Sequence, residues 1–329
     1  MKFARTERKA ISTNMDELVK RGKLEGYPSF PLVITPLASY VNLRQWLAAN
    51  MDSVYTELND AGAMLFRGFD IDGQDGFASL MSLLSNDHLL EYKYKSTPRA
   101  HVGGKIYTST EYPANQEIPM HNEMSYTSSW PMKIVFYSKI TAEEGGATPL
   151  AHSGEVYKMI PPEIREEFER KKVMYTRFYG DLDLKWQDVF QTTEKSGVSA
   201  FCDKAGINYK WSGDYLKTWQ ICDAVRLHPL SKEMLWFNQA HLFHVAALEQ
   251  EVRKSLLALV DEDELPRNAC FGDGSRIDDE VIYLINDIYR KASIVFPWQT
   301  NDLLLLDNMK VAHGRMPFKG TRKVLVGMY

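Results

Sequence analysis

The chain has 329 residues, which is enough for about two domains of roughly 150 residues or for one β-barrel or sandwich with long insertions. Its 39 Lys and Arg residues and 43 Asp and Glu residues give a net charge of −4, which argues against general nucleic-acid binding and against attachment to an anionic membrane. The 3 cysteines include no Cys-x-x-Cys pair, so we expect reduced thiols in a cytoplasmic protein. Residues 1–10 lack the apolar core of a signal peptide, and no apolar stretch approaches the roughly 18 to 20 residues that span a bilayer.

The first hundred residues predict two helices and a strand. Between Asn42 and Asn59, apolar residues recur at helical spacing. Asn42 is placed to cap the start of this helix, and Gly62 follows as a stop signal. The short apolar run 63–69 predicts a buried strand, and residues 77–84 predict the second helix.

From residue 100 onward, short β-rich runs alternate with turns. Helices interrupt them at 161–168, which begins with proline, and at 278–290, where apolar residues share one face. Since no repeat or linker divides the chain, we expect one α+β domain over residues 1–329, with a β sandwich or barrel core and a long insertion. The predicted strands are 133–140, 173–179, 234–237, 293–296, 303–306 and 323–328.

The strongest chemical signal combines the segment His121-Asn-Glu123 with His313 near the C-terminus. In an extended chain, the side chains of His121 and Glu123 point to the same face. His313 follows the apolar strand 303–306 and could supply a third ligand from across the sheets. Two histidines and one carboxylate on one face of an octahedral metal leave three positions open, as in non-haem Fe(II) oxygenases. Alone, however, His-x-Glu often arises by chance at ordinary surface or core positions.

Two further segments favour a bound carboxylate near these residues. Gly145-Gly-Ala-Thr-Pro149 places the hydroxyl of Thr148 beside two flexible glycines, and Arg322 follows His313 after a turn. If that turn reverses the strand, Arg322 returns to the depth of His313. Its guanidinium can then bind a carboxylate through two hydrogen bonds, with Thr148 assisting. The alternatives are a surface salt bridge for Arg322 and a simple hairpin turn for the two glycines.

Five short motifs follow one another along the chain: His121-Asn-Glu123, Gly145-Gly-Ala-Thr-Pro149, Trp236-Phe-Asn-Gln239, Gly272-Asp-Gly274, and Asp307-Asn308 through His313-Gly-Arg-Met-Pro-Phe-Lys-Gly-Thr-Arg322. Together they resemble the TauD/TfdA family of Fe(II)- and 2-oxoglutarate-dependent dioxygenases. Within that family, the chain most resembles the SyrP-like enzymes found with non-ribosomal peptide synthesis. The resemblance covers roughly residues 28–329 and is densest after residue 110.

The resemblance implies a double-stranded β-helix, or jelly-roll, with helices packed outside it. It assigns His121, Glu123 and His313 to iron, and Thr148 and Arg322 to the far carboxylate of 2-oxoglutarate. The implied cofactors are therefore Fe(II) and 2-oxoglutarate as a cosubstrate. In the family's reaction, 2-oxoglutarate is decarboxylated to succinate and CO2 while a C–H bond of the substrate is oxidised.

Two positions depart from the commonest pattern of the family. Most relatives have Asp where this chain has Glu123, although Glu is common in the SyrP-like branch. Related halogenases lack the carboxylate, so Glu123 favours oxygenation. Taurine dioxygenases have a further arginine at the position of Val326, so we do not expect a sulfonate substrate.

His241 and His244, with Glu249 and Glu251 after them, could suggest a zinc hydrolase site. The His-Glu-x-x-His order of such a site is missing. We therefore expect this segment to line the substrate pocket, with Asn238 and His241 contacting the substrate. The other histidines outside the triad are expected to be structural or surface residues.

The sequence thus predicts a hydroxylase that acts on an unactivated C–H bond of an amino acid, or of an amino-acyl group tethered to a carrier protein, in secondary metabolism. Its expected partners are this substrate and a carrier protein, without nucleic acid or membrane. Two alternatives stay open. The same iron site could desaturate, epoxidise or cyclise a free small molecule, or the chain could be a non-catalytic jelly-roll binding protein.

Overall fold

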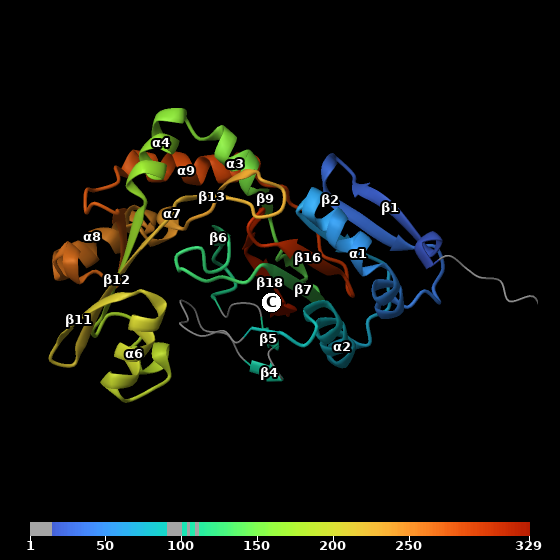
Figure 1. Ribbon diagram of the computed structural model, residues 1–329, viewed down its shortest axis with the longest axis horizontal. Coiled ribbons are helices and arrows are strands. Elements are labelled where there is room, and N and C mark those ends of the chain that lie inside the picture. The colour runs from blue at the N-terminus through green and yellow to red at the C-terminus, as the bar shows by residue number, and fades with distance from the viewer. Residues whose placement is uncertain (1–14, 91–100, 104–105, 109–111) are drawn as a thin grey trace, which may run out of the picture.

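The computed structural model describes residues 15–90, 101–103, 106–108 and 112–329 (Figure 1). They form mixed helices and sheets, which confirms the predicted α+β composition. None of the helices in these ranges is long and apolar enough to cross a membrane. The helices are α1 (Leu43–Ala61), α2 (Gly73–Ser85), α3 (Ser153–Met159), α4 (Pro162–Lys171), α5 (Trp186–Phe190), α6 (Lys195–Ala205), α7 (Ala240–Phe243), α8 (Gln250–Leu259) and α9 (Asp279–Ala292), with the 3₁₀ turns η1 (Met15–Leu18), η2 (Val245–Ala247) and η3 (Glu262–Glu264). The strands are β1 (Val19–Leu24), β2 (Tyr27–Pro36), β3 (Ala63–Phe66), β4 (His101–Gly103), β5 (Ile106–Thr108), β6 (Ile118–His121), β7 (Lys133–Ile140), β8 (Glu144–Gly145), β9 (Leu150–His152), β10 (Val173–Tyr179), β11 (Asn208–Ser212), β12 (Tyr215–Cys222), β13 (Val225–Leu227), β14 (Met234–Trp236), β15 (Arg267–Phe271), β16 (Leu303–Asp307), β17 (Val311–Arg315), β18 (Phe318–Lys319) and β19 (Lys323–Met328).

Two sheets face each other around the centre of the molecule. The larger sheet has eight strands in the order β1-β2-β3-β16-β7-β19-β5-β4, and the smaller one has the order β6-β17-β9. Leu150 of β9 and Val311 of β17 share an apolar cluster with Leu306 of β16. The inner faces of the two sheets therefore pack on one another, and they form the β core that the sequence predicted.

The strand β16 shows why its sequence is continuously apolar. Leu303 and Leu305 belong to a cluster with residues of α1 and α2, such as Trp46. Leu304 and Leu306 belong to the cluster between the two sheets. Because side chains alternate along a strand, each face of β16 meets a different apolar layer. Both faces are buried, so the run needs no polar positions.

The helix α1 covers the outer face of the larger sheet and forms as its sequence predicts. The side chain of Asn42 accepts a hydrogen bond from the backbone N–H of Gln45 at 3.0 Å. Gly62 ends the helix with a φ of 76°, a conformation that glycine adopts at little steric cost. The chain then enters β3 directly, so the cap also sets where this central strand begins.

Most of the chain between β9 and β16 folds outside the two facing sheets and is the predicted long insertion. It contains the sheet β11-β12-β10-β15 and the helices α3 to α9, which occupy the left and top of Figure 1. The predicted strand 293–296 is wrong. Only Ile294 makes an isolated bridge, with Leu150, because this run leaves α9 and reaches Pro297 after a few residues.

Candidate metal centre and substrate cavity

Two neighbouring strands bring the predicted triad together. His121 ends β6, His313 lies in the middle of β17, and the two residues are paired in the antiparallel register. Their ring centroids lie 4.6 Å apart. One ligand atom from each of His121, Glu123 and His313 lies within 4.8 Å of the other two. The three side chains singled out in the sequence therefore converge on one point.

Glu123 reaches this point by a different route from the expected one. Since β6 ends at His121, Glu123 lies in the following turn, and the alternation of a strand does not explain its direction. The next residue, Met124, has a φ of 57°. The backbone N–H of Glu123 donates to Oδ1 of Asn308 at 2.8 Å. A hydrogen-bonded turn therefore directs this carboxylate.

The donor set fits a ferrous ion. Nδ1 of His121 donates to the carbonyl oxygen of Pro119 at 2.8 Å. In the neutral ring this fixes the tautomer and leaves Nε2 with the lone pair that a metal needs. The ring of Phe136 packs edge-on against His313, with 5.1 Å between centroids. Two imidazoles and one carboxylate leave coordination positions for further ligands.

Gly314 allows the two histidine-bearing strands to approach each other. A Cβ atom at this position would lie 2.6 Å from the carbonyl oxygen of Ile118, closer than real Cβ contacts. The register of β6 and β17 also shifts between His313 and Arg315. A larger residue at position 314 would have to push β17 away from β6, and with it His313 from His121.

Arg322 borders a second, smaller cavity, and Thr148 is connected to it through Trp298. Arg322, Gly146 and Trp298 line this space of about 190 Å³. The indole N–H of Trp298 donates to Oγ1 of Thr148 at 3.1 Å, so the buried hydroxyl keeps its own proton to donate to an anion. The turn after β17 does not simply reverse the strand, the condition under which Arg322 would return to the depth of His313. It leads through β18 into β19 of the opposing sheet, and Arg322 immediately precedes β19.

The guanidinium of Arg322 is partly buried and charged. Burial, and then the charge of Arg315, lower the pKa of Arg322 to about 10, which still leaves it protonated near neutral pH. Its Nε donates to the carbonyl oxygen of Gly146 at 2.8 Å. Gly146 has a φ of 70°, and a Cβ there would lie 3.0 Å from Cδ of Arg322. The glycine thus makes room for the arginine, and this partly buried cation suits a carboxylate ligand.

Two residues of the triad also border a larger cavity of about 480 Å³. His121 and Glu123 line it, and so does an ion pair in which Nε of Arg267 lies 3.1 Å from Oδ2 of Asp183. The rest of the wall is mainly apolar, and it includes Ile118, Tyr126, Leu242, Phe243 and Val252. This is the size and character of a pocket for a small organic molecule.

Asn238 and His241 do not line this cavity, contrary to the expectation that they contact the substrate. The Nδ2 of Asn238 donates to the carbonyl oxygen of Ala224 at 2.9 Å. The Nε2 of His241 donates to the carbonyl oxygen of Met120 at 2.8 Å. Both side chains satisfy backbone groups in the interior, and His241 supports the strand that carries His121. His244 is the histidine of this segment that lines the cavity.

The buried ring of His241 makes stability depend on pH. Its complete burial lowers its pKa to about 4, although the bond to Met120 acts in the opposite direction. In the unfolded chain a histidine has a pKa of about 6.5. This contribution is therefore fully present above pH 6.5 and is lost as the pH falls from about 6.5 towards 4, by about 3 kcal/mol in total. We expect urea unfolding between pH 7 and 4.5 to show a smaller loss of stability for His241→Gln than for the wild type. Equal losses in the two proteins would show that His241 does not cause the loss of stability at low pH.

Three buried amide side chains around the triad were not predicted as site residues. They are Asn122, Gln239 and Asn308, all of which lie inside the recognised motifs. Nε2 of Gln239 donates to the carbonyl oxygen of Asn122 at 2.7 Å, and Asn308 binds the backbone of Glu123. Their position within the motifs was the available signal. Nothing in their local pattern indicates which backbone groups they reach.

Two imidazoles with a carboxylate suit Fe(II) and O2, and the partly buried cation of Arg322 suits an acidic cosubstrate. This combination defines the class of non-haem iron oxygenases. The sequence matches the family described as taurine catabolism dioxygenase TauD, TfdA family, over residues 31–329. The chain belongs to this family, as the sequence motifs predicted, and it is an Fe(II)- and 2-oxoglutarate-dependent dioxygenase.

Two relatives match most of the chain. The dapdiamide synthesis protein DdaC of Enterobacter agglomerans is 45% identical over 273 residues, which cover 82% of this chain and 83% of DdaC. A clavaminate synthase-like protein of Arabidopsis thaliana is 28% identical over 320 residues, covering 91% and 93% of the two chains. The similarity therefore extends over nearly the whole fold and is not limited to the metal motif.

Solved structures with low sequence identity share the fold. PvcB of Pseudomonas aeruginosa has a TM-score of 0.56 at 13% identity, over 98% of this chain and 94% of PvcB. AAD-2, solved in complex with Mn(II) and N-oxalylglycine, has a TM-score of 0.53 at 14% identity, over 94% of this chain and 96% of AAD-2. These likenesses support the jelly-roll core expected from the motifs, with helices around it.

Proposed function

We propose that the protein hydroxylates an unactivated C–H bond of an amino acid or amino-acyl group in secondary metabolism. The observation that carries this proposal is the convergence of His121, Glu123 and His313, two of which line a largely apolar cavity. The 45% identity to a dapdiamide synthesis protein supports a role in the synthesis of an amino-acid-derived product. The three cysteines are free thiols, which supports the cytoplasm as the location.

In this proposal each part of the site has one task. His121, Glu123 and His313 hold Fe(II), while Arg322 and Thr148 bind the far carboxylate of 2-oxoglutarate. When bound, the iron and 2-oxoglutarate together activate O2, with release of succinate and CO2. The apolar wall excludes water and holds the substrate C–H bond close to the metal. This positioning lowers the entropic part of the activation barrier.

The composition of the larger cavity supports a substrate with an apolar body and an ionic head. Glu123 is buried, whereas the paired side chains of Arg267 and Asp183 are 31% and 25% exposed, so the ion pair lies nearer the solvent than the carboxylate of the triad. Arg267 can bind a carboxylate and Asp183 an ammonium group. A free amino acid offers both groups, whereas an amino-acyl thioester offers only the ammonium.

We infer carrier tethering only from the resemblance to SyrP-like enzymes, and it can be tested directly. We expect amino acids, offered free and as carrier-linked thioesters with Fe(II), 2-oxoglutarate and O2, to yield a product that has gained one oxygen atom. Faster turnover of the thioester would support a carrier partner, and equal turnover of both forms would remove the case for one. A product that has lost two hydrogens, or gained a ring, would instead favour desaturation or cyclisation.

A further inference from the structure

Asn308 makes an unusual set of contacts with the backbone of Glu123. Its Oδ1 accepts from the N–H of Glu123 at 2.8 Å, and its Nδ2 donates to the carbonyl oxygen of the same residue at 2.9 Å. The Nδ2 also donates to the carbonyl oxygen of Pro131 at 2.7 Å. Because Asn308 is fully buried, no water competes for these bonds. A single side-chain amide thus pairs with both backbone groups of the carboxylate-bearing residue.

This pairing replaces contacts that a sheet would otherwise provide. Since β6 ends at His121, no strand ladder holds residue 123 in place. A neighbouring strand would offer one acceptor and one donor to the backbone of Glu123, and the amide of Asn308 offers the same two groups. The carboxylate of Glu123 can therefore be held in position although its residue lies in a turn.

The other side of the turn is held as well. Nδ2 of Asn122 donates to the backbone oxygen of Asn308 at 2.6 Å and to Oγ of Ser153 at 3.0 Å. Nε2 of Gln239 donates to the backbone oxygen of Asn122 at 2.7 Å. Asn122 thus bonds to the backbone of Asn308, while the side chain of Asn308 bonds to the backbone of Glu123.

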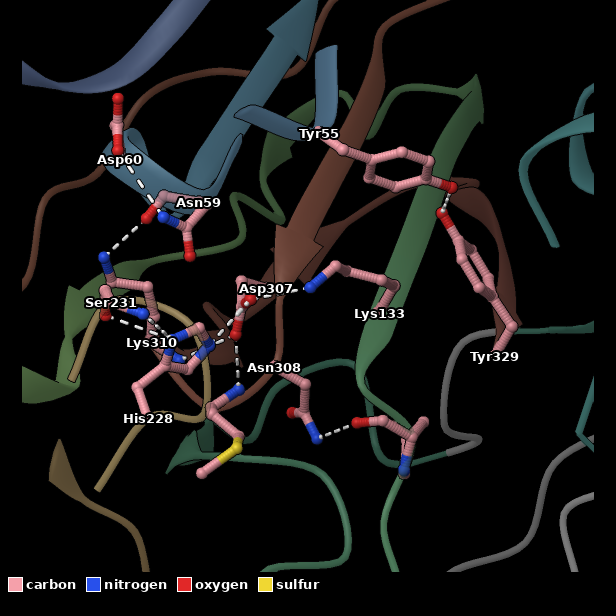
Figure 2. A network of polar contacts seen from close by, with 12 residues as sticks. Tyr55, Asn59, Asp60, Lys133, His228, Ser231, Asp307, Asn308, Lys310 and Tyr329 are labelled. Carbon is pink, nitrogen blue, oxygen red and sulfur yellow. Dashed lines mark hydrogen bonds and ion pairs between the residues drawn. The ribbon is translucent and has the colours of Figure 1, made fainter. Parts of the chain in front are cut away.

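Asp307 fixes the turn from which Asn308 extends (Figure 2). Its Oδ1 accepts from the backbone N–H groups of Met309 and Lys310 at 3.0 and 3.2 Å. Its Oδ2 lies 2.7 Å from Nζ of Lys133 and 3.2 Å from Nε2 of His228. The carboxylate of Asp307 is completely buried, so these partners hold it without competition from solvent. Buried polar contacts of Asp307 therefore hold the turn that carries Asn308.

From these contacts we infer that Asn308 is a positioning residue that holds Glu123 at the distance and direction the metal requires. The inference rests on the proposed role of Glu123 as an iron ligand. It predicts that Asn308 controls metal affinity, although Asn308 is not one of the three ligands and lines neither of the two cavities. Loss of a residue that hydrogen-bonds to a metal ligand typically weakens metal binding about 10- to 100-fold.

The test compares two variants by the affinity for Mn(II) alone, without O2 or 2-oxoglutarate, by calorimetry. Asn308→Asp keeps the shape of the side chain but turns an oxygen towards the carbonyls of Glu123 and Pro131. Asn308→Ala removes the contact without that repulsion, and it serves if the Asp variant does not fold. We expect the dissociation constant for Mn(II) to rise about 10- to 100-fold in either variant.

A matched control separates positioning from general stability. Asn268 is also buried, and its Oδ1 accepts from the backbone N–H groups of Ala269 and Val245 at 2.9 and 3.3 Å. We expect Asn268→Ala to lower the melting temperature but to bind Mn(II) like the wild type. If the Asn308 variants melt earlier but also bind Mn(II) like the wild type, the positioning role is wrong. If the wild type itself binds no Mn(II), the metal site fails instead.

Discussion

Replacing His121 with alanine is expected to reduce succinate formation more than about a hundredfold. Loss of a residue that only hydrogen-bonds to a metal ligand already lowers metal affinity or activity by up to about a hundredfold. His121 is itself one of the three proposed ligands, so its loss should have a larger effect. With two ligands left, the position of the iron would no longer be fixed by the β6–β17 pair. The measurement is succinate released from 2-oxoglutarate under saturating Fe(II) and O2.

The fold should survive this change, so the loss can be attributed to the site. Circular dichroism should show unchanged secondary structure in His121→Ala. His88→Ala is a suitable control, because His88 lies on the surface after α2 and is remote in sequence from the motifs. We expect wild-type succinate formation from the control. A His121→Ala variant that forms succinate as fast as the control would exclude His121 as a ligand.

Replacing Arg322 with alanine is expected to weaken 2-oxoglutarate binding while iron still binds. Removing one partner of a buried charge pair costs about 2 to 5 kcal/mol, which corresponds to about a 30- to 4,000-fold rise in the dissociation constant. Arg322→Lys should recover part of this loss, because it keeps the charge but not the two-pronged hydrogen bonding of a guanidinium. The 2-oxoglutarate affinity can be measured by calorimetry with Mn(II) in place of iron.

The control for Arg322 is an arginine outside the site. Arg276 is largely exposed and lies 3.7 Å from Glu262, a distance at which a surface pair contributes little. Arg276→Ala should bind 2-oxoglutarate like the wild type. If Arg322→Ala also does so, another group must bind the far carboxylate, and the assignment of Arg322 and Thr148 is wrong.

Many of the helices and strands could be predicted from local sequence patterns. The cap at Asn42 and the stop at Gly62 determine α1, and the apolar runs of β7, β10 and β19 end where the predicted strands end. The run 293–296 has the composition of a strand but finds no partner strand, only the bridge at Ile294. Strand pairing depends on neighbouring strands that are distant in sequence, and the composition of a single run does not indicate whether such a neighbour exists.

The candidate site was predictable where chemistry requires particular residue types at short spacing. His121, Glu123 and His313 converge as the motifs indicated, although Glu123 does so from a turn. The amide of Asn308 and the pair of Asp183 with Arg267 were not anticipated. Their roles depend on which backbone group or side chain lies opposite them in space. The sequence around such common residue types does not indicate these partners. The same ambiguity explains why Asn238 and His241, which look like pocket residues, instead bond to buried backbone oxygens.

In the proposed function, this chain couples 2-oxoglutarate oxidation to iron held by the triad. The most direct measurement is the amount of succinate formed aerobically by metal-free protein as Fe(II) is added back. We predict no succinate without iron, a rise that saturates at one iron per chain, and no comparable rise for His121→Ala. Succinate that forms equally without iron, or equally in His121→Ala, would mean that iron held by the triad does not drive the reaction.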